Sequence, residues 1–366
     1  MKVKFIIGLF LLLPGSIHFL YAQPEKQDKG AYYKEQLNIL YKAIRDSFYM
    51  PHAGFYKEQL EPGGNQKRYS YLWPLCALIQ ADNEMEKLGL PGDLMHETLG
   101  IIQHYYSPAA PAPGYDSYVV EDGGGDRFYD DNQWIGLAVM DAYDRTGNKS
   151  YLSTGKLIYR FMMTGFDTLS GGGLHWKEGS LGGKNTCSNG PGILLALQLY
   201  KATKEKKYMD TALLLYHWVN AHLQSPEGLY YDNLNVRNGR IGRHFFSYNT
   251  GTMLEANVYL YELTHQQKYL QEAIRLADAS SQYFLGDGKF RDGYWFSAVL
   301  LRGYQHLLLD HTDRKYVQMF EKCTDEALEQ NRQSSGLLGK DHPVNLVNQG
   351  GMLEILARLA WIETKM

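Results

Sequence analysis

The sequence predicts an all-α, single-domain protein whose six helical hairpins close into a double ring, an (α/α)6 barrel. Three observations predict it. Apolar residues recur with a helical period along almost the whole chain, a hairpin-sized pattern repeats, and short connections alternate with long ones. Residues 1–22 have the character of an export signal, so the predicted domain spans residues 23–366.

Helical periodicity extends over most of that domain. Leu37, Leu40, Tyr41, Ile44 and Phe48 fall on one face of a helix, for example, and no convincing run of alternating residues predicts a strand. The predicted helices are residues 31–49, 70–89, 92–106, 130–146, 149–163, 187–203, 206–223, 248–264, 267–284, 295–311, 314–332 and 348–364.

A Tyr–Thr–Tyr pattern marks the repeat. In each copy the Thr ends one helix and the second Tyr opens the next. The copies are Tyr143, Thr146 and Tyr151, then Tyr200, Thr203 and Tyr208, then Tyr261, Thr264 and Tyr269. They begin 57 and 61 residues apart, so the mature chain has room for close to six hairpins, which can close into a ring.

The connections differ in length according to the end of the barrel on which they lie. Those at 147–148, 204–205 and 265–266 are very short. The long ones are residues 50–69, 107–129, 164–186, 224–247, 285–294 and 333–347. Antiparallel hairpins place all long loops at one end, and ordered loops longer than about 12–15 residues are usually functional. We therefore expect the site at that end.

Asp130 and Asp131 lie at this end, after the glycines at 123–125 and at the start of a predicted helix. Two carboxylates this close repel each other, so at least one should have an altered pKa. That favours an acid/base pair. The structural alternative is helix capping, for which Asp is equally suited.

Amides, carboxylates and aromatic rings gather at the same end. The candidate substrate-binding residues are Tyr129, Asn132, Trp134, Trp176, Lys184, Asn185, Asn189, Asp232, Tyr248, Asn249, Trp295 and Phe296. Singly, each has a structural interpretation as a cap, a turn residue, a solvated charge or a packing residue. Together they provide what a carbohydrate site needs, hydrogen-bonding groups and flat apolar faces.

Several other functions are excluded by what the sequence lacks. No HExxH, CxxC or histidine cluster predicts a metal, and no P-loop or dinucleotide fingerprint predicts a cofactor. The net charge is −3 with no basic stripe, which argues against nucleic acid. The three cysteines form no disulfide framework, and Cys76 and Cys323 are expected in the core.

The amino terminus resembles an export signal. Lys2 and Lys4 precede an apolar stretch, residues 5–13, and cleavage is expected near Ala22. The stretch is too short to span a bilayer, although an uncleaved anchor is the alternative. We expect a periplasmic or extracellular monomer with no membrane span in the mature chain.

These residues resemble glycoside hydrolase family 76, the α-1,6-mannanases. The most specific match is the motif at 129–134, Tyr-Asp-Asp-Asn-Gln-Trp. Supporting matches are residues 172–176, 184–185, 188–189, 247–251 and 296–302. The resemblance implies an (α/α)6 barrel, Asp130 as nucleophile and Asp131 as general acid/base. One departure is Ile135, where the family often has a second tryptophan.

The expected function is that of a retaining glycosidase acting on the α-1,6-linked backbone of mannan, attacking internal bonds. Retention is favoured because neighbouring Cα atoms lie about 3.8 Å apart, which suits the closer of the two carboxyl separations used by glycosidases. Two alternatives stay open: another toroidal glycan-active enzyme, such as a uronyl hydrolase or lyase, and a non-catalytic mannan-binding surface protein. Acidic sugars should require more basic residues than Lys184 and Arg291.

Overall fold

The computed structural model describes residues 28–61, 67–339 and 344–366, which contain twelve α-helices and seven short strands. The predicted signal at 1–22 lies outside these residues. The helices are α1 (Lys29–Phe48), α2 (Leu72–Lys87), α3 (Leu94–Ile102), α4 (Tyr129–Thr146), α5 (Lys149–Met163), α6 (Thr186–Thr203), α7 (Lys206–Leu223), α8 (Ser247–Thr264), α9 (Gln267–Leu285), α10 (Tyr294–Leu307), α11 (Lys315–Asn331) and α12 (Leu346–Lys365).

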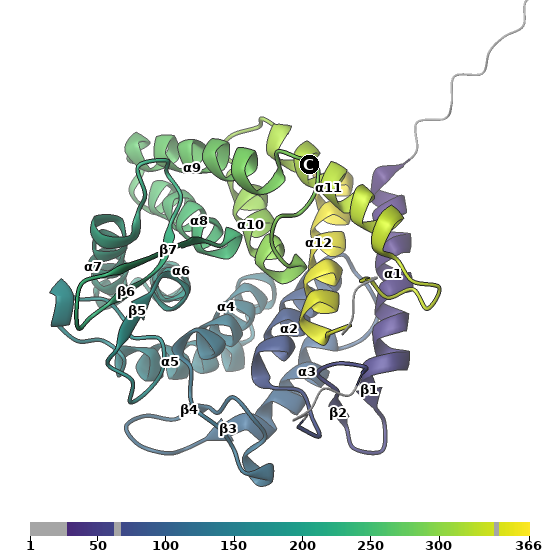
Figure 1. The fold of residues 1–366 in the computed structure, drawn as a ribbon, viewed down its shortest axis with the longest axis horizontal. Coiled ribbons are helices and arrows are strands. Elements are labelled where there is room, and N and C mark those ends of the chain that lie inside the picture. The colour runs from purple at the N-terminus through teal and green to yellow at the C-terminus, as the bar shows by residue number, and fades with distance from the viewer. Residues whose placement is uncertain (1–27, 62–66, 340–343) are drawn as a thin grey trace, which may run out of the picture.

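The helices form two concentric rings, which confirms the predicted (α/α)6 barrel (Figure 1). The inner ring consists of α2, α4, α6, α8, α10 and α12, and it closes because α12 packs against α2. The outer helices α3, α5, α7, α9 and α11 each pack on the inner helix before them, and α1 packs on α12. All twelve predicted helices are present, although α3 ends at Ile102 instead of extending to 106, and α10 ends at Leu307 instead of extending to 311.

The two rings differ in how much of each helix is buried. In α6 every residue from Thr186 to Leu199 is buried, since the helix is enclosed on all sides. In α5 only Gly155, Ile158, Phe161 and Met162 are buried, on one face. The apolar period of an outer helix therefore faces the inner ring, while an inner helix needs small and apolar residues all around.

The repeated threonines have the same role in three hairpin turns. Thr146, Thr203 and Thr264 each donate a hydroxyl hydrogen bond of 2.6–2.7 Å to the carbonyl four residues earlier. Each also accepts a bond from the backbone N–H two residues later. The residue after each threonine has a left-handed backbone; these residues are Gly147, Lys204 and His265.

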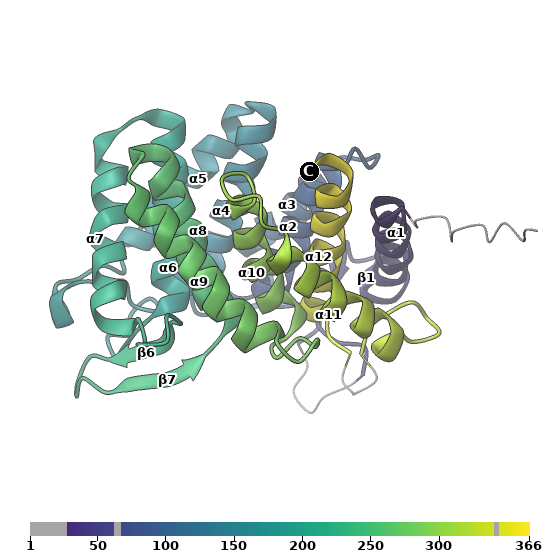
Figure 2. The same ribbon diagram turned by 90° about the horizontal axis from the view of Figure 1, so that it is seen from above.

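Short strands occur at the long-loop end, where the sequence predicted none. They are β1 (Tyr49–Met50), β2 (Phe55–Tyr56), β3 (Tyr106–Ser107), β4 (Gly114–Tyr115), β5 (Gly183–Asn185), β6 (Tyr231–Asn235) and β7 (Ile241–Phe245). The last three form an antiparallel sheet in the order β5-β6-β7. Figure 2 shows β6 and β7 projecting beyond the helices. Strands this short have no apolar alternation to reveal them in the sequence.

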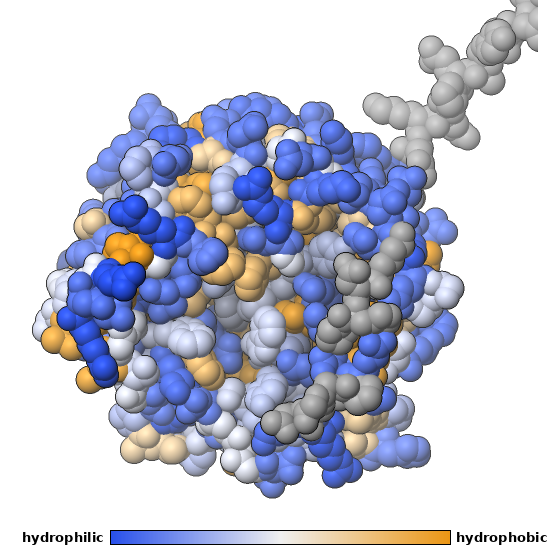
Figure 3. Space-filling model, viewed as in Figure 1, coloured by the Kyte–Doolittle hydropathy of each residue, from blue (hydrophilic) through white to orange (hydrophobic). Residues whose placement is uncertain are grey.

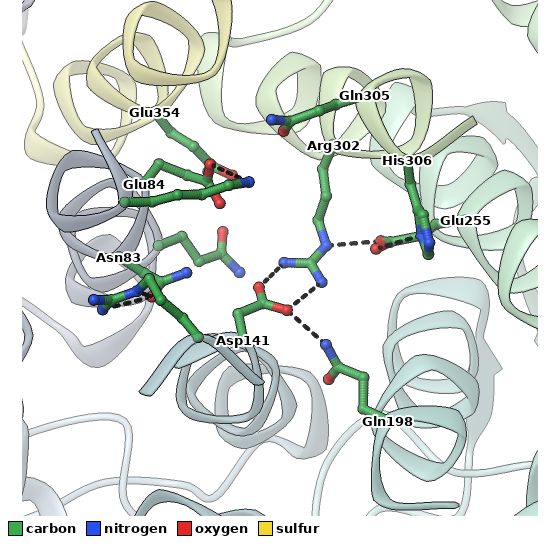
Figure 4. Close-up of polar contacts among 12 residues, drawn as sticks. Asn83, Glu84, Asp141, Gln198, Glu255, Arg302, Gln305, His306 and Glu354 are labelled. Atoms are coloured by element: carbon green, nitrogen blue, oxygen red, sulfur yellow. Dashed lines mark hydrogen bonds and ion pairs between the residues drawn. The ribbon is translucent and has the colours of Figure 1, made fainter. Parts of the chain in front are cut away.

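A ring of buried polar side chains joins the inner helices at the short-turn end (Figure 4). Arg302 of α10 bonds Glu255 of α8 at 2.7 Å and Asp141 of α4 at 3.0 Å. Gln198 of α6 donates to the same aspartate at 2.7 Å. The ring continues through Arg358 of α12, which contacts Glu84 of α2 at 3.2 Å. These charges are buried but paired. Replacing one partner would leave the other as an unpaired buried charge, which strongly destabilises the fold.

Within the described ranges, no helix combines the length and apolar character needed to cross a membrane.

The turn geometry gives a test of stability. At a left-handed backbone position, a residue with a side chain costs about 1–2 kcal/mol of strain. Glycine avoids this strain but loses more backbone entropy on folding, about 0.5–1 kcal/mol. Lys204→Gly and His265→Gly should therefore each raise the free energy of unfolding by about 0.5–1 kcal/mol. Gly147→Ala, the reverse change, should lower it. Urea denaturation measures all three, and a loss of stability in both glycine variants would contradict this account.

Candidate active site

A cavity of about 700 Å³ opens at the long-loop end of the barrel. Figure 3, which views this end, shows a hollow near the centre of the face where pale and apolar side chains gather. The lining residues are Tyr71, Trp73, Ser117, Phe128, Asp130, Asp131, Trp134, Trp176, Gly182, Gly183, Asn185, Cys187, Asp232, Asn233, Asn235, Tyr248, Trp295 and Phe296.

Asp130 and Asp131 lie in the first turn of α4, with both residues lining the cavity. The N-cap of that helix is Phe128, so neither aspartate occupies the N-cap position. Asp130 Oδ1 accepts the backbone N–H of Asp131 at 3.0 Å, and Asp130 Oδ2 accepts the indole N–H of Trp176 at 2.9 Å. The thiol of Cys187 is a further hydrogen-bond partner of Asp130. These donors hold the Asp130 carboxylate in one orientation.

The two carboxyls differ in their affinity for a proton. Burial raises the pKa of Asp130 to about 6, against the opposing effect of its hydrogen-bond donors. Burial also raises the pKa of Asp131 well above its ordinary value, and the charges of Asp130 and then Glu58 raise it further. Asp131 therefore retains its proton at a pH where Asp130 has lost its own.

Aromatic rings form much of the cavity wall. The Trp295 ring centre lies 5.4 Å from that of Trp134 and 5.9 Å from that of Trp73. On another side, the rings of Tyr248 and Phe296 are 4.3 Å apart. Trp176, which binds Asp130, is 44% exposed at the rim. The carboxyls are thus bordered by flat apolar surfaces.

The polar part of the wall is neutral or acidic. Asn185 of β5 and three residues of β6, Asp232, Asn233 and Asn235, supply it. Among the described residues no Lys, Arg or His side chain lines this cavity. Nor does the described part of the chain contain three His, Cys, Asp or Glu side chains grouped to hold a metal ion.

Most of the predicted substrate-binding residues line the cavity, but five do not: Tyr129, Asn132, Lys184, Asn189 and Asn249. All five are buried, and for most of them a protein partner explains the burial.

The buried asparagines Asn132 and Asn189 act as amide clamps, by which we mean a side-chain amide that binds both backbone groups of one loop residue. Asn132 holds the N–H and C=O of Tyr115 at 2.7 and 2.9 Å, and Asn189 holds those of Leu174 at 2.7 and 3.0 Å. Gln349 does the same for Leu338. Each clamp fastens a long loop to the inner helix that follows it.

Lys184 stabilises the loop that carries Trp176. Its fully buried ammonium group donates to Asp167 Oδ1 at 2.6 Å and to the carbonyls of Leu169 and Gly172 at 2.7 and 2.5 Å. His175 contacts the other oxygen of Asp167 at 2.7 Å. Nothing in the sequence indicated that the charge of this loop lysine would form a buried ion pair within the protein.

Several lining residues were missed from the sequence. Trp73 lies at the start of the inner helix α2. The expectation that the site lies at the long-loop end, where the inner helices begin, therefore applied to Trp73 as well as to Asp130. Asn233 and Asn235 lie on β6, which no periodicity revealed. Cys187 is at the start of α6, and only its placement beside Asp130 makes it notable.

Enzymes that cleave glycosidic bonds place two carboxyls beside the bond. The pair Asp130 and Asp131, in an aromatic cavity of an (α/α)6 barrel, has this arrangement. The family model described as Glycosyl hydrolase family 76 matches residues 41–343. Because this is most of the chain, the protein belongs to glycosyl hydrolase family 76.

Individual relatives are more distant. The chain is 28% identical over 171 residues to a protein named mannan endo-1,6-alpha-mannosidase DCW1 of Candida albicans, covering 42% of this chain and 38% of the relative. The chain therefore matches well under half of that relative's length.

Two solved structures share the fold. The family 76 mannosidase Bt3792 of Bacteroides thetaiotaomicron VPI-5482 has a TM-score of 0.79 and 26% identity, covering 91% of this chain and 99% of that one. An inactive variant of the α-1,6-mannanase GH76A of Salegentibacter sp. HEL1_6, in complex with α-1,6-mannotriose, has a TM-score of 0.76 and 23% identity, covering 90% and 99%.

The raised pKa of Asp130 predicts a pH-dependent cost to stability. Because the folded pKa of about 6 exceeds the ordinary 3.8, the folded protein holds this proton more tightly, and stability falls as the pH rises through that interval. Asp130→Asn should thus raise the free energy of unfolding by about 1–3 kcal/mol at pH 8 and much less at pH 4. Denaturant unfolding at both values measures this.

Asp210→Asn is the matched control, because Asp210 forms an exposed ion pair on α7. It should change stability by less than about 0.5 kcal/mol at either pH. Equal effects of Asp130→Asn at pH 4 and pH 8 would contradict the burial of an ionised Asp130.

Proposed function

We propose that this protein is a retaining glycoside hydrolase that cleaves internal α-1,6-mannosidic bonds in mannan backbones. The observation that carries the proposal is the partly buried pair Asp130 and Asp131, adjacent in sequence and both facing one aromatic cavity. Membership of family 76 supports it. So do the names of relatives described as mannan endo-1,6-alpha-mannosidases.

The two carboxyls have different proposed roles, Asp130 as nucleophile and Asp131 as general acid/base. The order of their proton affinities supports this assignment, because the acid must still hold a proton when the nucleophile has lost its own. In the Salegentibacter mannanase, the variant with two aspartates replaced by asparagine is described as inactive. We propose that Asp130 and Asp131 are equally necessary here.

The proposed reaction has two steps. In the first, an oxygen of Asp130 attacks the anomeric carbon while the bond to the glycosidic oxygen breaks, and Asp131 gives its proton to that leaving oxygen. The product is a mannosyl ester of Asp130. In the second, the Asp131 carboxylate takes a proton from water, the water oxygen attacks the anomeric carbon, and the ester bond to Asp130 breaks.

Adjacent side chains favour this double displacement. Their Cα atoms are about 3.8 Å apart, which suits the carboxyl separation of about 5–5.5 Å in retaining enzymes. An inverting enzyme needs about 6.5–9.5 Å to admit a water molecule. The indole N–H of Trp176 and the backbone N–H of Asp131 both donate to the Asp130 carboxylate, and these bonds support the charge of the nucleophile before attack.

A neutral sugar suits the cavity better than an acidic one. Uronyl hydrolases and lyases act on carboxylates, which call for cations, and among the described residues none lines the cavity. Lys184 is committed to Asp167, and Arg291 pairs with Asp287. We also propose that residues 1–22 direct export, which would place the enzyme where it meets polysaccharide.

Replacing either aspartate should abolish most of the activity. Asp130→Ala and Asp131→Ala should each lower kcat on unbranched α-1,6-mannan by about 100- to 10,000-fold, the range for loss of a nucleophile or an acid/base group. Product chromatography measures the released oligosaccharides. Asp126→Ala, which removes an exposed acid of the same loop, is the control. A non-catalytic binding protein would release nothing even as wild type, and near-normal turnover by either alanine variant would defeat the assignment.

The thiol of Cys187 should influence the acid side of the pH profile. Its hydrogen bond lowers the pKa of Asp130, so Cys187→Ala should raise that pKa and move the acid limb of kcat/KM to higher pH. We expect a loss of about two- to tenfold at pH 5 and less at pH 7. Cys323→Ala, a buried cysteine on α11, is the control. Parallel loss at both pH values would mean that Cys187 affects only the fold.

A further inference from the structure

The hairpin formed by β6 and β7 concentrates positive charge at the rim of the cavity. Arg237, Arg240, Arg243 and His244 are all exposed, and we call these four residues the basic hairpin. From 233 to 246 the sequence contains no acidic residue, although the whole chain has a net charge of −3. Within the described ranges, none of the four forms an ion pair with a carboxylate.

The hairpin is continuous with the cavity wall. Asn233 and Asn235 of β6 line the cavity, and β6 pairs with β7 through Asn233 opposite Gly242. Arg237 follows Asn235 by two residues, in the turn of the hairpin, and its backbone N–H donates to Asn235 Oδ1 at 3.0 Å. The cations therefore begin within about one or two residues of the cavity edge. Figures 1 and 2 show the same hairpin extending outward from the barrel at this end.

A row of aromatic rings connects the other strand of the hairpin to the cavity. The His244 ring centre lies 6.1 Å from that of Phe246. Phe246 in turn lies 5.8 Å from Tyr248 and 5.7 Å from Phe296, which both line the cavity. The charge of His244 also acts on the carboxyl of Asp232 in the cavity wall, whose pKa it lowers against the larger effect of burial.

The cavity and the hairpin beside it differ in charge, so they suit different parts of a substrate. The cavity around Asp130 and Asp131 carries no cation among its described residues, so it suits a neutral sugar at the point of cleavage. The cations lie just outside, where a neighbouring unit or side branch of the same polymer would pass. The Arg243 guanidinium lies 5.9 Å from the centre of the Tyr231 ring. An exposed guanidinium group that is not paired with a carboxylate can bind phosphate in a bidentate manner.

We propose that the basic hairpin binds phosphate groups carried by the mannan, so that the preferred substrate is a phosphate-substituted mannan. The inference rests on the proposed function and deepens it. The phosphate does not react; it is held by Arg237, Arg240 and Arg243 while a neutral mannosyl bond occupies the cavity. The attraction between exposed charges must weaken with salt.

The test compares two triple variants of the full mature protein. Arg237→Gln, Arg240→Gln and Arg243→Gln remove the hairpin charges. Lys149→Gln, Lys204→Gln and Lys268→Gln remove three exposed charges from the short-turn end, so both proteins change net charge equally. The substrates are one linear α-1,6-mannan, the same mannan after light chemical phosphorylation, and the same mannan after carboxymethylation, with kcat/KM measured at about 10 mM and about 1 M NaCl.

At low salt the wild type should cleave the phosphorylated mannan about 3- to 30-fold faster than the neutral one, and high salt should remove the difference. The arginine variant should lose this preference while retaining its rate on neutral mannan. The lysine variant should keep it. An equal preference for carboxymethylated mannan would overturn the assignment to phosphate, and an unchanged preference in the arginine variant would overturn the hairpin site.

Binding separates this proposal from the proposed function. The double variant Asp130→Asn, Asp131→Asn should bind phosphorylated mannan more tightly than neutral mannan in calorimetry, whether or not the wild type cleaves either. Vesicles of phosphatidylglycerol serve as the second anionic probe. Binding to these vesicles without preferential binding to phosphorylated mannan would overturn the proposal in favour of a membrane surface. Absence of cleavage of neutral mannan by the wild type would instead contradict the proposed function.

Discussion

Closure of the inner helical ring is the constraint on which the rest of the structure depends. Arg302 and Arg358 bring the charges of α2, α4, α8, α10 and α12 together at one end, and Gln198 adds α6 (Figure 4). Such pairs are costly to bury and costlier to break. Four of these positions, Glu84, Asp141, Gln198 and Glu255, recur at intervals of 57 residues, so the same hairpin repeat that builds the ring also supplies its polar closure.

The opposite end of the ring carries the long loops and the cavity. All inner helices begin there, each preceded by a long loop, and amide clamps from Asn132, Asn189 and Gln349 fasten three of these loops to the helices. The loops and helix starts line the cavity that holds Asp130 and Asp131, and they shield both carboxyls partly from solvent. Burial is the largest cause of both raised pKa values, so the chemistry of the pair follows from the architecture around it.

Sequence reasoning succeeded where the signal repeats or is long. Twelve helices have enough residues to show their period, and the Thr146 turn recurs at Thr203 and Thr264 with the same hydrogen bonds. It failed where the role depends on a distant partner. Lys184 is buried because Asp167 and two carbonyls neutralise and solvate it, and spacing along the chain does not encode that. The strand β6 was not predicted for a related reason. Its polar residues face a cavity, so it shows no apolar alternation.

The stereochemistry of the first product tests the central claim, that Asp130 and Asp131 act together by double displacement. Proton NMR of unbranched α-1,6-mannan during the first minutes of digestion distinguishes the two anomers before they equilibrate. Retention through a mannosyl ester of Asp130 predicts that the α-anomer of the new reducing end appears first, followed by the β-anomer. Initial release of the β-anomer would show a single displacement by water and would contradict the account.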